Sequence, residues 1–170
     1  MAFRWHALCF NSSVKQIISM TDELSGDGYE EKRTVPEPLM RWTGAILSRA
    51  SQRVRDSFES RTSDSCLKSK HYGALILLED GPKTQIELGR QLWIDRTSMV
   101  ALVDELEKSG NVKRERHPED RRAYLVQLTE QGRVSLAKAR EIADAVEDEI
   151  FSALSDEERE QLRRLLARLI

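Results

Sequence analysis

The sequence predicts a mainly α-helical fold with one short β-hairpin, and three observations lead to this prediction. Apolar residues recur every three or four positions on both sides of the chain's middle, which is typical of amphipathic helices. Two polar capping signals divide the middle into two short helices. A β-branched, partly alternating run then follows a charged turn. Two short helices followed by a hairpin indicate a winged helix-turn-helix.

The two short helices are defined by their caps. Thr84 and Glu87 have the spacing of a capping box, which starts a helix that we expect to end near Leu92. Asp95 caps the next helix, and Gly110 stands where a glycine closes a helix. On this second helix we expect three apolar residues to face inward: Val100, Val103 and Leu106.

A change of period marks the hairpin. Its first strand begins at Val112, the charged turn is PEDRR (118–122), and the second strand is YLVQL (124–128). Longer helices flank this centre, over about 68–79, from the cap Thr129 to about Phe151, and after the capping box at Ser155 and Glu158. An earlier apolar stripe predicts a helix from residue 39: Leu39, Trp42, Ile46, Ala50 and Val54.

Charge is distributed unevenly along the chain. The net charge is −2, yet residues 108–122 carry six positive and three negative side chains, whereas residues 129–170 carry seven positive and ten negative ones. No apolar run approaches the ~20 residues of a membrane span. The apolar stretch 7–10 is shorter than the roughly 7–15 residues of a secretory signal. We therefore expect a cytoplasmic protein with a local basic surface.

This arrangement indicates DNA binding. The second short helix can enter the major groove, which is about 12 Å wide. Its first turn carries amides that favour phosphate and hydroxyls that reach base edges. Arginines at the hairpin tip can reach the minor groove, and cations on the first strand suit phosphates. The predicted DNA contacts are Thr84, Arg96, Thr97, Ser98, Ala101, Lys113, Arg114, Arg116, Asp120, Arg121 and Arg122.

The stretch 81–133 resembles the MarR family of bacterial transcription regulators. It carries the pattern GP-T, IDRT, LVD-LE--G, PEDRR and LT--G, and the D-x-R wing motif falls on Asp120 and Arg122. The resemblance implies a six-helix protomer, an obligate homodimer, a pseudo-palindromic operator, and release by a small ligand or an oxidant. It also implies that Arg122 enters the minor groove and that Asp120 braces the wing.

The ends of the chain independently favour a dimer. The last helix has an apolar stripe that needs a partner, and a short helix is marginal alone. The predicted dimer residues are Leu39, Leu162, Leu165, Leu166, Leu169 and Ile170. The alternative is that this helix folds back onto its own protomer. We expect a poorly ordered arm over 1–38, a dimerisation region over 39–66 and 129–170, and a DNA-binding domain over 67–128.

The signal, meaning the ligand or oxidant that would release the protein from DNA, is less well defined by the sequence. A pocket for a small aromatic or phenolic ligand has six candidate residues, for which a core role is the alternative: Trp42, Ile46, Arg49, Tyr72, Ile76 and Trp93. Oxidant sensing at Cys66, beside Lys68 and Lys70, is a second possibility. The three histidines are scattered, so we expect no metal site and no cofactor.

Two other classes of function are weaker. A protein-interaction module on a winged-helix scaffold would not need the basic segment 108–122. An enzyme would need a catalytic constellation, and the sequence contains neither a Ser-His-Asp candidate nor a glycine-rich phosphate loop. We therefore predict a non-enzymatic, dimeric DNA-binding regulator, a repressor released by a ligand.

Overall fold

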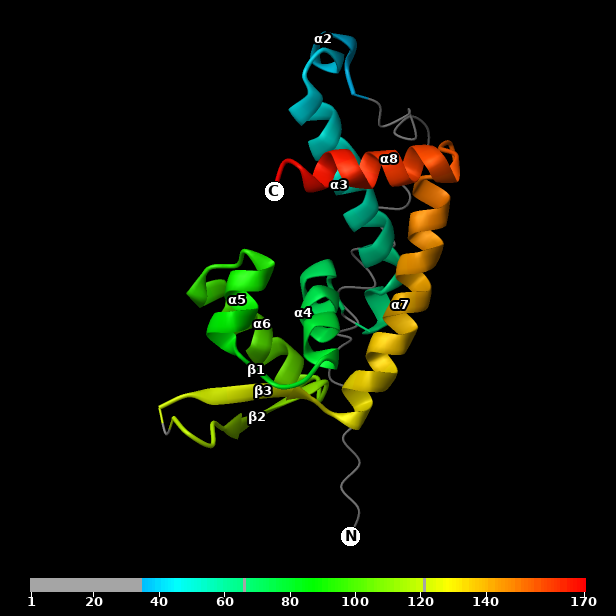
Figure 1. Ribbon diagram of the computed structural model, residues 1–170. Helices are drawn as coiled ribbons and strands as arrows, with labels where there is room; N and C mark the ends of the chain where they lie inside the picture. The colour runs from blue at the N-terminus through cyan, green and yellow to red at the C-terminus, as the bar shows by residue number, and fades with distance from the viewer. Residues whose placement is uncertain (1–34, 66, 121) are drawn as a thin grey trace, which may run out of the picture. The chain divides into compact units, whose positions relative to one another are not determined.

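The computed structural model describes residues 35–65, 67–120 and 122–170 (Figure 1). Seven α-helices and three strands lie in these residues: α2 (Glu37–Met40), α3 (Thr43–Arg61), α4 (Ser69–Glu79), β1 (Lys83–Thr84), α5 (Gln85–Leu92), α6 (Arg96–Lys108), β2 (Val112–Arg116), β3 (Tyr124–Leu128), α7 (Glu130–Ile150) and α8 (Asp156–Ala167). A 3-10 turn, η1 (Ser63–Ser65), follows α3. The chain divides into two compact units, Met1–Ile46 and Leu47–Ile170.

The first apolar stripe forms two helices rather than the single one predicted. α2 is one turn that begins at Glu37, between Pro36 and Pro38, and prolines suit only the start of a helix. The helical pattern restarts at Thr43, followed by Gly44, a weak helix former. Of the arm predicted over 1–38, residues 1–34 lie outside the described part of the chain, and residues 37–38 belong to α2.

The hairpin forms as predicted, and a third strand joins it. β2 pairs with β3 antiparallel, from Val112 opposite Leu128 to Arg116 opposite Tyr124. β1 pairs with the other edge of β3, so the sheet order is β1-β3-β2. The sequence did not indicate β1 because two residues cannot show an alternating pattern. In Figure 1 the hairpin extends past α5 and α6, and α7 begins where β3 ends.

One core joins the helix-turn-helix, the sheet and α7. Its members are buried apolar side chains from every α-helix and strand between α3 and α7 except β1: Phe58, Leu75, Leu88, Val103, Val126 and Leu136 are examples. On α6 the buried face consists of Met99, Leu102, Val103 and Leu106, which are spaced 3, 1 and 3. The prediction for Val100 was wrong, because this side chain is 41% exposed, one position away from the buried face.

The last helix exposes its apolar stripe in the single chain. α8 contains no buried residue. Its predicted capping box is present, because Ser155 and Glu158 are bonded reciprocally. Leu162 and Leu166 are half-buried, whereas Leu165 is 48% exposed. Leu169 and Ile170 follow the helix, and both are exposed. Across the described ranges, no helix has both the length and the apolar character needed to cross a membrane.

Candidate nucleic-acid interface

Reciprocal capping fixes the start of the helix-turn-helix. The Thr84 hydroxyl accepts a hydrogen bond from the Glu87 amide (3.2 Å), and the Glu87 carboxylate accepts the Thr84 amide (2.7 Å), as the sequence predicted. The same hydroxyl also donates to the Glu87 carboxylate (2.8 Å). The hydrogen bond from the Thr84 amide lowers the pKa of Glu87. The hydroxyl of Thr84 is therefore engaged within the protein.

The turn between α5 and α6 is tight. Trp93 adopts the left-handed conformation (φ 57°), and its amide bonds to the Gly89 carbonyl. A Cβ atom on Gly89 would stand 3.0 Å from the carbonyl oxygen of Ile94, so a larger residue would make the backbone at Ile94 shift by a few tenths of an ångström. The Asp95 carboxylate then accepts the Ser98 amide (3.0 Å) and caps α6. Hydrogen bonds from Ser98 lower the pKa of Asp95.

The first turn of α6 presents its side chains to solvent. The side chains of Arg96, Thr97, Ser98 and Ala101 are all exposed. Val100 adds an exposed apolar group, and because it lies three residues after Thr97 it shares that face of the helix. Sequence reasoning missed Val100 as a candidate contact, although its spacing from Thr97 could have indicated it. The outer face of α6 is thus polar at its start and small and apolar one turn later.

The wing presents cations on β2 and at the turn. Lys113 and Arg116 are exposed on β2, and the ammonium of Lys113 lies 2.6 Å from the Glu115 carboxylate. At the tip, the Asp120 carboxylate accepts the amide of Arg122 (2.9 Å), whose side chain is exposed. Arg121 lies outside the described residues.

Arg114 is engaged differently from the other basic residues of the wing. Its side chain is only 19% exposed, and its guanidinium forms ion pairs with Asp104 (2.5 Å) and with Glu107. The Arg114 amide also donates to the Glu107 carboxylate (3.1 Å). Burial alone would lower the pKa of Arg114, but the two carboxylates raise it. This residue joins β2 to α6, so the wing and the second helix are held together.

Two further junctions hold α6 and α7. The Glu105 carboxylate on α6 lies 3.1 Å from Nε2 of His71 and 3.3 Å from the Lys68 ammonium, and the hydrogen bond from Lys68 lowers the pKa of Glu105. At the start of α7, the Thr129 hydroxyl accepts the Gly132 amide (3.0 Å) and donates to the Gly110 carbonyl (2.6 Å). Gly110 has φ 75°, as expected for a residue that closes α6.

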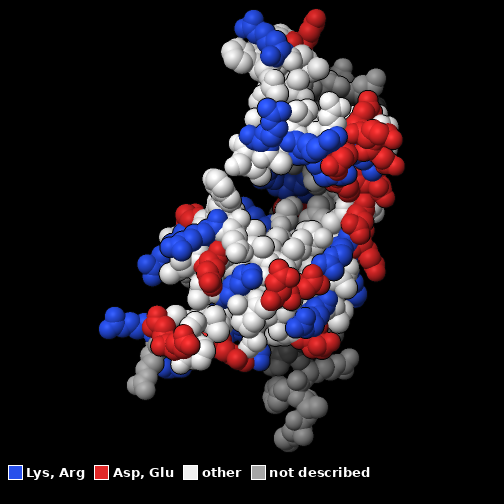
Figure 2. All heavy atoms as spheres, in the orientation of Figure 1, with Lys and Arg blue, Asp and Glu red and all other residues white. Residues whose placement is uncertain are grey.

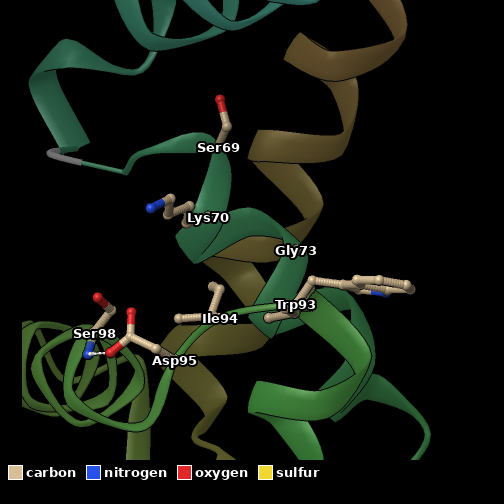
Figure 3. Close-up of a pocket in the computed structure, with 8 residues that line it drawn as sticks. Ser69, Lys70, Gly73, Trp93, Ile94, Asp95 and Ser98 are labelled. Atoms are coloured by element: carbon tan, nitrogen blue, oxygen red, sulfur yellow. Dashed lines mark hydrogen bonds between the residues drawn. The ribbon is translucent and has the colours of Figure 1, made fainter.

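One of the six predicted ligand residues, Trp93, borders a pocket within the second unit. This pocket, of about 230 Å³, lies between α4 and the turn before α6, and of the six only Trp93 contributes to its lining (Figure 3). Trp93 is 87% exposed, and Figure 3 shows its indole pointing away from Asp95 and Ser98. Tyr72 is half-buried, with its ring centroid 5.2 Å from that of Phe58, and burial raises its pKa.

The other predicted ligand residues, Trp42, Ile46, Arg49 and Ile76, are exposed. The guanidinium of Arg41 lies 5.3 Å from the ring centroid of Trp42. Cys66, the predicted redox residue, lies outside the described residues. No group of three or more metal-ligating side chains occurs in the part of the chain that the structure describes.

Figure 2 shows acidic side chains gathered where α7 meets α8, whereas side chains of both signs project at the hairpin. A tight helix-turn-helix with an open, capped second helix and a basic hairpin defines the winged helix-turn-helix class of proteins.

Comparison with known proteins agrees with this class. The family model described as MarR family matches residues 75–124. A probable transcriptional regulator from Pseudomonas aeruginosa is 35% identical, with a TM-score of 0.71, and the match covers 76% of this chain and 97% of that one. The transcriptional repressor CouR, solved bound to a 23-mer DNA duplex, is 32% identical (TM-score 0.74; 80% of this chain, 97% of that one).

A third solved structure concerns regulation of DNA binding by 6-hydroxynicotinic acid in BpsR of Bordetella bronchiseptica. It is 26% identical (TM-score 0.70; 75% of this chain, 91% of that one). The chain belongs to the MarR family of transcription regulators.

Proposed function

We propose that this chain is a homodimeric repressor that binds a pseudo-palindromic DNA operator and is released from it by a small ligand. The observation that carries the proposal is the open first turn of α6, which Asp95 caps while Arg96, Thr97 and Ser98 remain exposed. The exposed Arg96 guanidinium suits phosphate, and the short hydroxyls suit base edges. The solved DNA complex of the repressor CouR supports the same interpretation.

We assign the major groove to α6. Arg96, Thr97 and Ser98 would contact phosphates and base edges at the start of the helix. Ala101 and Val100 would follow one turn later, where small apolar groups permit close approach and contact with a thymine methyl. Asp95 has no such role, because its carboxylate is committed to the cap.

We assign the minor groove to the wing. Arg122 would enter the groove, and Asp120 would brace the turn by holding the Arg122 amide. Lys113, Arg116 and Arg121 would meet phosphates. We leave two predicted contacts out of the interface, since both side chains are half-buried as well as engaged within the protein: Thr84 with Glu87, and Arg114 with Asp104 and Glu107.

The dimer would use the apolar residues at both ends of the chain. Leu165, Leu169 and Ile170 are exposed, as is Leu39 near the other end. We propose that residues 39–66 and 129–170 pack across a two-fold axis, while residues 67–128 bind DNA. Such a dimer would place two α6 helices about 34 Å apart, one turn of DNA. The half-buried Leu162 and Leu166 would complete the apolar face.

For the signal we propose a small aromatic acid. DNA binding by BpsR is regulated by 6-hydroxynicotinic acid, and this relative therefore supports the same chemical class. The pocket beside α4 contains Lys70, whose ammonium could pair with a carboxylate.

One experiment tests the DNA proposal. A duplex is selected from a random pool with the full chain, and its binding is measured by fluorescence anisotropy across a range of salt concentrations. Arg122→Ala should weaken binding by about tenfold and reduce the salt slope by about one. The matched control Lys138→Ala removes an exposed positive charge from α7 and should leave binding unchanged.

Two results would contradict the proposal. If Arg122→Ala binds the selected duplex as tightly as the wild type, the wing does not contact DNA as assigned. If sedimentation gives one chain per duplex, the dimer is wrong. Adding 6-hydroxynicotinic acid or salicylate to the same assay tests the proposed class of signal.

A further inference from the structure

The wing turn is closed by hydrogen bonds within residues 117–123. The His117 amide donates to the Ala123 carbonyl (3.1 Å), which continues the pairing of β2 with β3. The Ala123 amide donates to the Asp120 carbonyl (3.0 Å). These two backbone bonds close the turn, but they leave the amides of Glu119 and Asp120 to be satisfied by something else.

The imidazole of His117 satisfies both of these amides. Its Nδ1 accepts the amide of Glu119 (3.2 Å) and the amide of Asp120 (3.1 Å). The side chain is half-buried, and the intervening Pro118 has no amide to compete. The carboxylate of Asp120 in turn holds the amide of Arg122 (2.9 Å). A sequence of contacts thus runs from His117 through Asp120 to Arg122.

We infer that His117 is a positioning residue for the wing, whose neutral imidazole presents Arg122 to DNA and whose protonation weakens DNA binding. The inference rests on the proposed function for its DNA consequence, and on the geometry of the turn alone for the role of the imidazole. A nitrogen that accepts two N–H groups must carry a lone pair, so the proton of the neutral ring resides on Nε2. Protonation of Nδ1 would point a donor at two donors.

The surroundings contain charges of both signs. Arg116, the last residue of β2, precedes His117, and Glu119 and Asp120 lie on the same turn as His117. On the neighbouring α5, Glu87 interacts electrostatically with His117 and with Lys83 of β1. Because the pKa of Glu87 is lowered, its carboxylate stays charged where an imidazole titrates, between about pH 5 and 8. A change of DNA affinity in that range therefore would not come from Glu87.

Two opposite effects make the inference testable. An added positive charge near DNA strengthens binding, whereas loss of the turn that holds Arg122 weakens it. A substituted asparagine separates the two effects, because its side-chain oxygen can accept nearby amides in a turn and does not titrate. An alanine at the same position removes the acceptor at every pH.

The first test needs no DNA. Nitrogen-15 NMR of the full chain at about pH 8 should show the Nε2–H tautomer of His117. On acidification to about pH 5.5, the amide signals of Glu119 and Asp120 should shift together with the imidazole. In His117→Asn these two amides should stay constant. Two results would overturn the inference: the Nδ1–H tautomer, or amide signals of Glu119 and Asp120 that do not change when the wild type is acidified.

The second test measures binding to the selected duplex. At about pH 8, His117→Asn should bind like the wild type and His117→Ala about tenfold more weakly. Between about pH 8 and 5.5, the wild type should lose affinity relative to His117→Asn. A wild type that gains affinity relative to His117→Asn on acidification would refute the positioning role, since charge alone would then govern the effect.

A double substitution connects His117 to Arg122. If His117 acts through Arg122, then His117→Ala with Arg122→Ala should bind no more weakly than Arg122→Ala alone. Additive losses would overturn the inference. If Arg122→Ala itself binds like the wild type, the proposed function of the wing fails, and the NMR titration still decides the role of His117. Equal melting temperatures of the single variants exclude general unfolding as the cause.

Discussion

A methyl group on Gly132 would collide with the backbone at the junction between the wing and α7. A Cβ atom at this position would stand 1.9 Å from the carbonyl oxygen of Asn111 and 2.9 Å from its carbonyl carbon. The obstacle is main chain, which cannot rotate away as a side chain can. The same carbonyl accepts the amide of Thr129 (3.1 Å), the residue that caps α7. Gly132→Ala should therefore disturb the cap as well as the packing.

The magnitude follows from three contributions. Overpacking of this severity costs about 3 kcal/mol, at the upper end of its usual range. A weakened helix cap costs about 1 kcal/mol. The higher helix propensity of alanine returns about 1 kcal/mol. We expect the free energy of unfolding to fall by about 3 kcal/mol, and the melting temperature by about 6–12 °C for a chain of this size.

The measurement is thermal and urea unfolding followed by circular dichroism. Gly44→Ala is the matched control, since a Cβ atom there meets nothing within 4 Å. This control should change the free energy of unfolding by less than about 1 kcal/mol, in the stabilising direction. If Gly132→Ala has the same melting temperature as the wild type, the Asn111 carbonyl can move without cost and the steric reasoning is wrong.

Two further predictions concern the junctions of the site. Arg114→Ala should destabilise the chain by about 1–2 kcal/mol in urea unfolding, because Asp104 and Glu107 lose the partner that joins α6 to β2; an unchanged midpoint would contradict this. For Glu87, the lowered pKa means that its bond to Thr84 stabilises the fold above about pH 4.3 and is lost as the pH falls through the lowered value. As the pH is lowered below about 4.3, the melting temperature should therefore fall less steeply in Glu87→Gln than in the wild type. Equal slopes of melting temperature against pH would contradict this expectation.

Much of the candidate site could be predicted because it depends on local contacts. The caps at Thr84, Asp95, Thr129 and Ser155 each use an amide three residues ahead, so the residue types and their spacing were sufficient. The hairpin strands and the turn between them followed from alternation and charge. The resemblance of residues 81–133 to one family agreed with the family model that matches residues 75–124.

Other features depended on contacts between distant parts of the chain. The sequence shows Arg114 as one of several basic residues, but its partners Asp104 and Glu107 lie on a preceding helix. The outward direction of Val100 depends on which face of α6 meets the core. The role of His117 depends on how the turn folds back on its imidazole. A linear pattern contains none of these distances.

The sequence by itself determined where the helices of the helix-turn-helix begin, where the hairpin turns, and that the basic charge gathers there. Capping and strand alternation involve neighbours within a few residues, so residue types and their spacing are sufficient to predict them. Tertiary structure alone decided which cations are engaged within the protein and which remain exposed. It also brought β1 to the edge of the sheet and placed the Asn111 carbonyl against Gly132, because these contacts form only when segments separated by many residues pack together.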